Sequence, residues 1–216
     1  MDDQLSQFVL DKSFPCIMAK AVVKTGLIKI IRINASDFSV ETLLENLYLF
    51  VDDYRKKPQK LRSFIVVLDD EESKTFEGYE KNFWKLITQM SLADKKLHPH
   101  DTRVSDNPQD PNFSYSVKSE AFFILGLHPQ SPRLARRFFR PAIVFNLHQQ
   151  FEDMRKKGIF SKVRNLIRKK DQLLQGTPNP MLSDFGEKSE IFQYLGKVYE
   201  SVSELNIQKG FSNASY

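Results

Sequence analysis

The stretch that most constrains the fold of this chain runs from Ala121 to Phe151, where two apolar segments flank a short basic one. Residues 121–127 carry no charge and are rich in β-branched and aromatic types, which is typical of a strand buried on both faces. Residues 142–147 form a second apolar run of the same kind. The connection between them begins with a turn at His128 and contains Arg133, Arg136, Arg137 and Arg140. We therefore predict two buried strands joined by a compact basic connection.

Polar side chains stand where each of these two strands ends. His128 follows the first strand directly, and Asn146 and His148 stand at the end of the second. Binding and catalytic groups are commonly carried at strand ends and on the loops that follow them. The pattern therefore predicts a functional site here, without indicating its chemistry.

The N-terminal part of the chain reads as a polar lead-in followed by a hairpin. Residues 1–13 are mostly polar, and Pro15 then introduces an apolar run from Ile17 to Val23. Proline suits the first position of a strand because it cannot donate to the ladder. After a short turn, Leu27 to Ile33 is predicted as the second strand of the hairpin.

Four further elements are predicted from hydrophobic periodicity. Residues 38–54 have apolar positions spaced as on one buried helical face, with Asp37 or Ser39 as the cap. Residues 64–68 form a buried strand, and a second amphipathic helix runs through Phe83 to Met90. Towards the C-terminus we predict a charged helix over 152–175, split at Gly158, and a final helix over 188–203.

The predicted order is β-β-α-β-α-β-β-α-α, which indicates an α+β or α/β fold with a mixed sheet flanked by helices. A chain of 216 residues is of the size expected for one domain. We therefore expect a single domain over residues 1–216, with residues 1–13 and about 205–216 as flexible ends. The long polar stretch 94–113 is expected to be a functional or disordered loop.

Several classes of protein are disfavoured by composition. No apolar run approaches the roughly 18 residues of a membrane helix. The first residues lack the basic and apolar regions of a signal peptide. The single cysteine, Cys16, excludes an intramolecular disulfide and fits a reducing compartment. We expect a cytoplasmic protein with no membrane partner.

The net charge of +5 is unevenly distributed along the chain. Residues 133–170 contain twelve Lys or Arg and two acidic residues, so this segment carries +10 and the remainder −5. Such a block fits a nucleic-acid surface, an anion or propionate pocket, or solvated helix faces. Nucleic acid is not expected as a partner, because the interleaved aromatic residues and the modules of RNA-binding and single-strand-binding proteins are lacking.

Common catalytic motifs do not explain the chain. The triplet at Asp184 matches a kinase motif by chance, since no Gly-rich loop or catalytic loop accompanies it. There is no Walker sequence and no dinucleotide-binding glycine pattern. What remains is one thiol, two strand-end histidines and an arginine cluster.

A series of short motifs occurs in order along the chain. The motifs are Phe14-Pro15-Cys16, Asp110-Pro111-Asn112-Phe113, Gly126-Leu127-His128-Pro129, the arginine-rich 131–140, Val144-Phe145-Asn146-Leu147-His148, Gln175-Gly176, Asn179-Pro180-Met181-Leu182, Asp184-Phe185-Gly186 and Gln193-Tyr194. In this order they resemble the YqcI/YcgG family. The resemblance runs from about Cys16 to Lys197, and two features depart from it. Leu195 stands where a serine is expected after Gln-Tyr, and a Cys-Pro-Phe ending is absent, which leaves Cys16 as the only thiol.

The resemblance implies a haem enzyme. Members of that family with a known activity are haem-dependent oxygenases that N-hydroxylate arginine or related guanidino compounds. The resemblance therefore implies haem iron as cofactor, O2 and an external reductant as co-substrates, a small-molecule substrate, and an electron-donor protein as a further partner. The alternatives are a haem-binding protein without turnover and a protein that binds nucleic acid through its basic surface.

The site residues implied by the resemblance fall into three groups. Cys16 is the expected axial ligand, because a thiolate favours O–O cleavage, and His128 and His148 are the alternatives. Arg133, Arg136, Arg137 and Arg140, spaced to share one face of a helical turn, are expected to hold the propionates. A cationic guanidino substrate is expected to contact Asn146, Asp184, Glu187 and Glu190.

Overall fold

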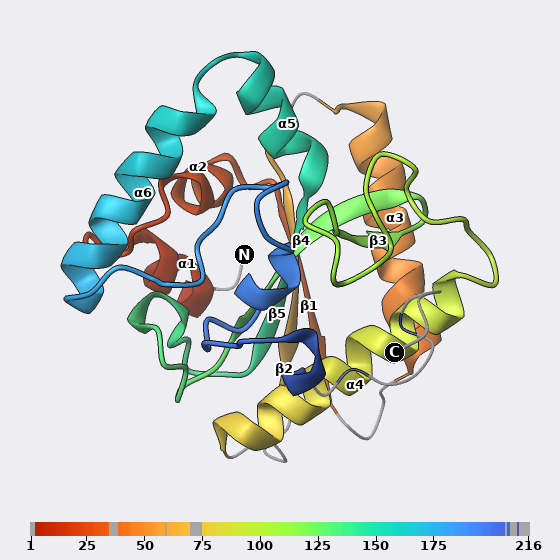
Figure 1. Cartoon of the computed structure of the whole chain (residues 1–216). Helices are drawn as coiled ribbons and strands as arrows, with labels where there is room; N and C mark the ends of the chain where they lie inside the picture. The colour runs from red at the N-terminus through yellow and green to blue at the C-terminus, as the bar shows by residue number, and fades with distance from the viewer. Residues whose placement is uncertain are drawn as a thin grey trace.

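The computed structural model describes residues 3–34, 39–58, 60–69, 75–205, 207 and 211. These residues form a single domain in which helices cover both faces of one five-stranded sheet (Figure 1). The sheet has the order β1-β2-β5-β4-β3, with β1 and β2 parallel and every other neighbouring pair antiparallel. The predicted mixed sheet is confirmed. Its strands are β1 (Ile28–Ile33), β2 (Ser63–Leu68), β3 (Tyr115–Val117), β4 (Glu120–Leu127) and β5 (Ala142–Leu147).

One face of the sheet carries the larger hydrophobic core. Helices α3 (Val40–Lys56) and α4 (Phe76–Asp94) pack there against alternate strand residues such as Phe64 and Phe145. Both helices confirm their predictions, and Ser39 caps α3 by accepting a hydrogen bond from the Thr42 amide. The other proposed cap, Asp37, lies outside the described residues.

The opposite face carries α1 (Asp3–Leu10) and α2 (Ile17–Thr25), which cover β1, β2 and the end of β4. Helix α5 (His148–Lys156) follows β5 directly, and α6 (Phe160–Gln175) returns over this face. The predicted break at Gly158 between these two helices is confirmed, since Gly158 has φ +67°.

The predicted N-terminal hairpin is wrong. Ile17–Val23 belongs to helix α2, so no strand precedes β1 in the described part of the chain. Cys16 caps the helix at its start, and Gly26 ends it in the left-handed conformation that glycine adopts readily. Residues 3–10 are also helical rather than an irregular lead-in, with Leu5 and Val9 buried.

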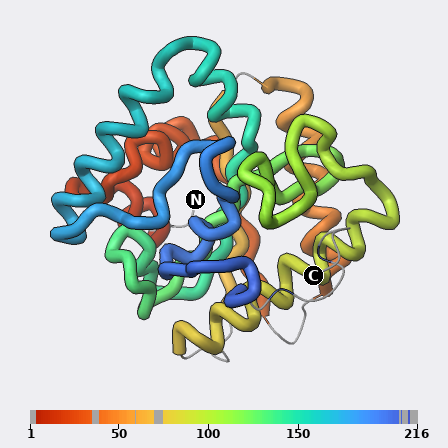
Figure 2. The backbone as a smooth tube through the Cα atoms, in the orientation of Figure 1, coloured from red at the N-terminus to blue at the C-terminus, as the bar shows by residue number. Residues whose placement is uncertain are grey.

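The predicted final helix over 188–203 is also wrong, since only the short 3-10 turns η3 (Glu190–Gln193) and η4 (Val202–Glu204) form there. The backbone carbonyl of Tyr194 accepts hydrogen bonds from the Gly126 amide and from Arg136. A carbonyl engaged with β4 in this way is not available for a helical ladder. Figure 2 shows this segment running back across the molecule after α6 to reach the sheet.

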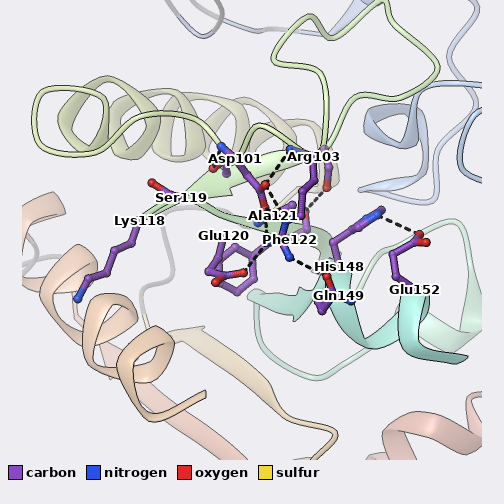
Figure 3. A network of polar contacts seen from close by, with 12 residues as sticks. Asp101, Arg103, Lys118, Ser119, Glu120, Ala121, Phe122, His148, Gln149 and Glu152 are labelled. Atoms are coloured by element: carbon purple, nitrogen blue, oxygen red, sulfur yellow. Dashed lines mark hydrogen bonds and ion pairs between the residues drawn. The ribbon is translucent and has the colours of Figure 1, made fainter. Parts of the chain in front are cut away.

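Residues 95–114, including most of the predicted polar loop, form an ordered connection between α4 and β3. Its Asp101 carboxylate is 3% exposed and accepts hydrogen bonds from the Ala121 amide at 2.9 Å and from the Arg103 guanidinium. Arg103 in turn bonds Glu120 at 2.8 Å and Gln149 at 2.7 Å. This network, drawn in Figure 3, ties the loop and the β3–β4 hairpin to the start of α5.

Candidate functional site

Two adjoining hollows lie on the face of the sheet that carries α1, α2 and α6. A cavity of about 290 Å³, which we call the α2 cavity, is bounded by α1, α2, α6 and the strands. A cleft of about 170 Å³, which we call the α5–α6 cleft, is bounded by those two helices and the segment 182–193. Five residues line both hollows, and they are Met18, Phe123, Phe151, Ile167 and Leu182.

The α2 cavity exists because strand side chains on this face are incompletely covered. Phe123, Leu125 and Val144 alternate with core residues along β4 and β5, yet they remain only partly buried. Phe8 and Phe14 close the cavity on the α1 side, with their rings packed edge to face at 5.2 Å. The walls are predominantly apolar, which suits a small organic ligand or a cofactor.

The thiol side chain of Cys16 lines the α2 cavity. It is partly buried at the N-cap of α2, where its Sγ accepts a hydrogen bond from the Ala19 amide at 3.4 Å. The helix N-terminus and the amide favour the thiolate, but burial has the larger effect and raises the pKa of the thiol. Cys16 is therefore held mainly as a neutral thiol until a cation or a metal stabilises the charged form.

Arg133 and Arg136 also line the α2 cavity, and both are buried. Arg136 donates to the backbone carbonyls of Gln193 and Tyr194, and burial lowers its pKa to about 10. Arg133 pairs with Asp171 on α6 and donates to the Thr177 carbonyl at 3.3 Å. Its Nε has no hydrogen-bond partner within the part of the chain that the structure describes. Arg133 therefore retains one donor for a further acceptor.

The other two arginines lie outside both hollows. Arg137 is exposed and donates from Nε to the Ser131 carbonyl at 2.8 Å, while Arg140 lies 3.4 Å from the Asp69 carboxylate. The predicted helical face shared by all four arginines is not formed, because only Leu134–Arg136 adopts a 3-10 turn. Burial of Arg133 and Arg136 also removes part of the basic segment from the surface.

The two strand-end histidines lie at opposite ends of the sheet, because β4 and β5 are antiparallel. His128 is 2% exposed and stacks on Tyr79, with ring centroids 5.0 Å apart, and its Nδ1 accepts from the Gln130 amide. It lines neither hollow. His148 is the first residue of α5 and lines the α5–α6 cleft.

The predicted substrate residues are divided between the two hollows. Asn146 lines the α2 cavity and accepts a hydrogen bond from Ser63 at 2.8 Å. Asp184 and Glu190 line the cleft, where Asp184 pairs with Arg164 and Arg168 of α6. The fourth, Glu187, is exposed and lines neither hollow; its carboxylate accepts from the Asp184 amide at 3.0 Å.

Glu190 and His148 form a buried polar part of the cleft. The Glu190 carboxyl, 5% exposed, accepts hydrogen bonds from Ser114 at 2.8 Å and from the Tyr194 hydroxyl at 2.9 Å. Burial is the largest cause that raises the pKa of Glu190, to about 8, while burial lowers the pKa of His148. Neutral forms of both groups are therefore favoured near pH 7.

His148 contacts carboxylates on both sides of its ring. Nε2 lies 3.2 Å from Glu152 Oε1, a pair drawn in Figure 3, and Nδ1 lies 4.0 Å from Glu190 Oε2. Sequence reasoning missed the partners Ser114 and Glu152. The i, i+4 spacing of His148 and Glu152 on a predicted helix was a signal that could have found one of them.

Within residues 3–34, 39–58, 60–69, 75–205, 207 and 211, no group of three or more His, Cys, Asp or Glu side chains is arranged to hold a metal ion. The helices in these same ranges include none that is long and apolar enough to cross a membrane.

Comparison with known proteins assigns the chain to a family. The model of the YqcI/YcgG family matches residues 5–204. The chain belongs to the YqcI/YcgG family. It is 26% identical over 186 residues to a protein of Bacillus subtilis (strain 168) described as "Uncharacterized protein YcgG", covering 82% of this chain and 72% of that protein.

A second relative in the family is described as "Uncharacterized protein YqcI", also from Bacillus subtilis (strain 168). The two chains are 29% identical over 118 residues, which is 53% of this chain and 46% of that relative. No solved structure matches the chain. The YqcI/YcgG assignment extends over α1 to η4 and includes both hollows.

Proposed function

We propose that this chain binds haem in the α2 cavity through Cys16, and that it uses O2 and an external reductant to N-hydroxylate a small guanidino or amine compound. The observation that carries the proposal is the Cys16 thiol, which caps α2 and lines a predominantly apolar cavity. Thiolate ligation favours cleavage of the O–O bond, which oxygen insertion into an N–H bond requires.

The residues around the cavity fit such a group. The Ala19 amide already donates to Cys16 Sγ, and a hydrogen bond of this kind orients and stabilises a ligating thiolate. Apolar side chains from α1, α2, β4 and β5 would face a macrocycle and exclude water from it. A cavity of about 290 Å³ lies just below the range of about 300–1,000 Å³ that is usual for ligand sites, and the adjoining cleft of about 170 Å³ extends the space into that range.

Arg133 is the residue best suited to a haem propionate. It is 6% exposed, lines the cavity, and has an Nε donor without a partner among the described residues. Arg136 is less suited, because it is engaged with two backbone carbonyls. We therefore narrow the four candidate arginines to Arg133, with Arg136 as a structural support.

Cys16 is a better axial ligand than either histidine. His128 lines neither hollow, and the two ring nitrogens of His148 face the carboxylates of Glu152 and Glu190. The Cys16 sulfur accepts from the Ala19 amide, has no charged partner of this kind among the described residues, and lines the cavity. Binding a cationic iron would offset the burial that disfavours the thiolate.

The proposed reaction consumes a substrate N–H, one O2, two electrons and two protons, and yields the N–OH product and one water. The substrate would lie in the α5–α6 cleft and reach Asn146, which lines the α2 cavity and donates to the carbonyl of the shared residue Phe123. Asp184 is paired with two arginines and Glu190 is mainly protonated near pH 7. The cleft therefore suits a substrate that carries its own carboxylate beside the guanidino group, such as an amino acid.

A haem titration of three proteins tests the proposal. Cys16→Ser removes the thiolate but keeps a side chain that caps α2, whereas Cys16→Ala removes both. We expect the wild type to bind haem stoichiometrically and to convert arginine, O2 and reductant to an N-hydroxylated product. Both variants should lose thiolate ligation and turnover, while Cys16→Ser retains wild-type thermal stability. Tight haem binding with unchanged ligation in Cys16→Ser would contradict the assignment of Cys16.

A further inference from the structure

His148 lies between a surface carboxylate and a buried one. It begins α5 directly after β5, and its ring packs edge to face on Phe185, with centroids 4.5 Å apart. Nε2 lies 3.2 Å from Glu152, whose side chain is 32% exposed, and Nδ1 lies 4.0 Å from Glu190, whose side chain is 6% exposed. The three groups thus form a line from solvent to the interior.

The inner end of this line reaches the α5–α6 cleft. Glu190 lines the cleft and is fixed by hydrogen bonds from Ser114 and Tyr194, both of which donate to Oε1. His148 lines the same cleft. A proton held on Glu190, which is 5% exposed, is therefore next to the space in which a ligand would lie.

We propose that Glu152, His148 and Glu190 form a proton relay from the surface into the α5–α6 cleft. The use of the delivered protons rests on the proposed function, in which each O2 consumes two protons. The residues that touch the ligand end are Glu190 and His148, and Glu152 acts through His148.

Each cycle of the relay moves one proton from water to the cleft. Glu190 gives its carboxyl proton to the reacting group in the cleft and becomes a carboxylate. A proton from water then passes through the Glu152 carboxylate to His148 Nε2, and the resulting imidazolium passes its Nδ1 proton to Glu190. The imidazole is left with its proton on Nε2, and a turn of the ring restores the Nδ1–H form before the next proton is delivered. The 4.0 Å between Nδ1 and Glu190 must shorten by about 1 Å or be bridged by a water molecule for this transfer.

Burial keeps the resting state of the relay neutral, and the surrounding charges only partly oppose it. Besides Glu152 and Glu190, the charged groups that influence His148 are Arg155 on the same helix and Asp101 and Arg103 on the loop before β3. Arg155 also influences Glu190, and the Tyr194 hydroxyl donates to it. The burial effects described above therefore leave a proton on Glu190 and an uncharged imidazole that is able to carry one.

The substitution Glu190→Gln distinguishes a proton relay from a purely structural role of Glu190. In Glu190→Gln the amide oxygen still accepts from Ser114 and Tyr194, so the packing is kept while proton transfer is lost. Glu187→Gln is the matched control, because Glu187 is exposed and lies outside both hollows.

Nuclear magnetic resonance of the His148 imidazole in the full chain without cofactor is the primary test. We expect the wild type and Glu187→Gln to show a second inflection near pH 8, where Glu190 ionises, and Glu190→Gln to lack it. An imidazole titration that is identical in all three proteins would overturn the relay, because the groups would not be coupled.

Turnover of the haem-loaded protein separates failure of the relay from failure of the proposed function. We expect Glu190→Gln to lower kcat about 100-fold with little change in KM, as for loss of a proton-transfer group. Unchanged kcat in Glu190→Gln would overturn the relay and leave the haem assignment intact. If the wild type binds no haem, the proposed function fails, whereas the imidazole titration still tests the coupling.

Discussion

Replacing Glu190 by glutamine should change how the stability of this chain depends on pH. Burial raises the pKa of this carboxyl from 4.5 to about 8 in the folded state. Between these values the folded chain holds one proton more than the unfolded chain. Its stability therefore falls as pH rises, at about 1.4 kcal/mol per pH unit, and this loss ends above pH 8.

The window from pH 6.5 to pH 8 isolates this effect. His148 acts in the opposite direction, since burial lowers its pKa below 6.5, but it is mostly uncharged in both states above that value. The Cys16 thiol has a pKa raised above 9.0 and titrates at higher pH. Integrated from pH 6.5 to pH 8, while Glu190 begins to ionise, this effect lowers the free energy of unfolding by about 1.5 kcal/mol.

Urea unfolding at a series of pH values measures this difference. The wild type should lose about 1.5 kcal/mol more than Glu190→Gln between pH 6.5 and pH 8. Glu187→Gln removes a carboxylate of the same charge from the surface and should follow the wild type. Parallel stability profiles for the wild type and Glu190→Gln would refute the reasoning, because the buried carboxyl would then not hold its proton.

Two further substitutions test the packing that forms the site. Gly126→Ala should destabilise the fold by about 2 kcal/mol, because the added Cβ would lie 2.7 Å from Tyr79 Oη and would also meet Leu195 Cδ2; thermal unfolding unchanged within about 1 °C would contradict this contact. Asp171→Ala should cost about 3–5 kcal/mol, because it leaves the buried Arg133 without its carboxylate partner. A loss under about 1 kcal/mol in urea unfolding would show that Arg133 finds another acceptor or water.

The helices and strands that were predictable from the sequence each have one clear hydrophobic pattern. β4 and β5 are apolar on both faces, and α3 has a regular apolar stripe, so neither type of element was ambiguous. The run from Ile17 to Val23 was ambiguous, because a short apolar segment suits a strand or a buried helix equally. Two features of the sequence would have favoured the helix. Gly26 is a residue type that commonly ends helices, and the segment lacks the two-residue turn sequences that hairpins strongly prefer.

The candidate site was only partly predictable, because it depends on how the strands pair. Cys16, Arg133 and Asn146 are far apart in sequence, and they line one cavity because α2, the β4–β5 connection and β5 meet on one face. The separation of His128 from His148 follows from the antiparallel pairing, which a short connection between adjacent strands already favours. Tertiary contacts alone brought Ser114 to Glu190, a contact for which local sequence holds no signal.

The absorption spectrum of the full chain, expressed with added haem precursor and recorded reduced under carbon monoxide, tests the central claim most directly. Ligation by Cys16 predicts a red-shifted, thiolate-type Soret band in the wild type that is lost in Cys16→Ser. No Soret band in the wild type, or a histidine-type band that is the same in Cys16→Ser, would contradict the claim.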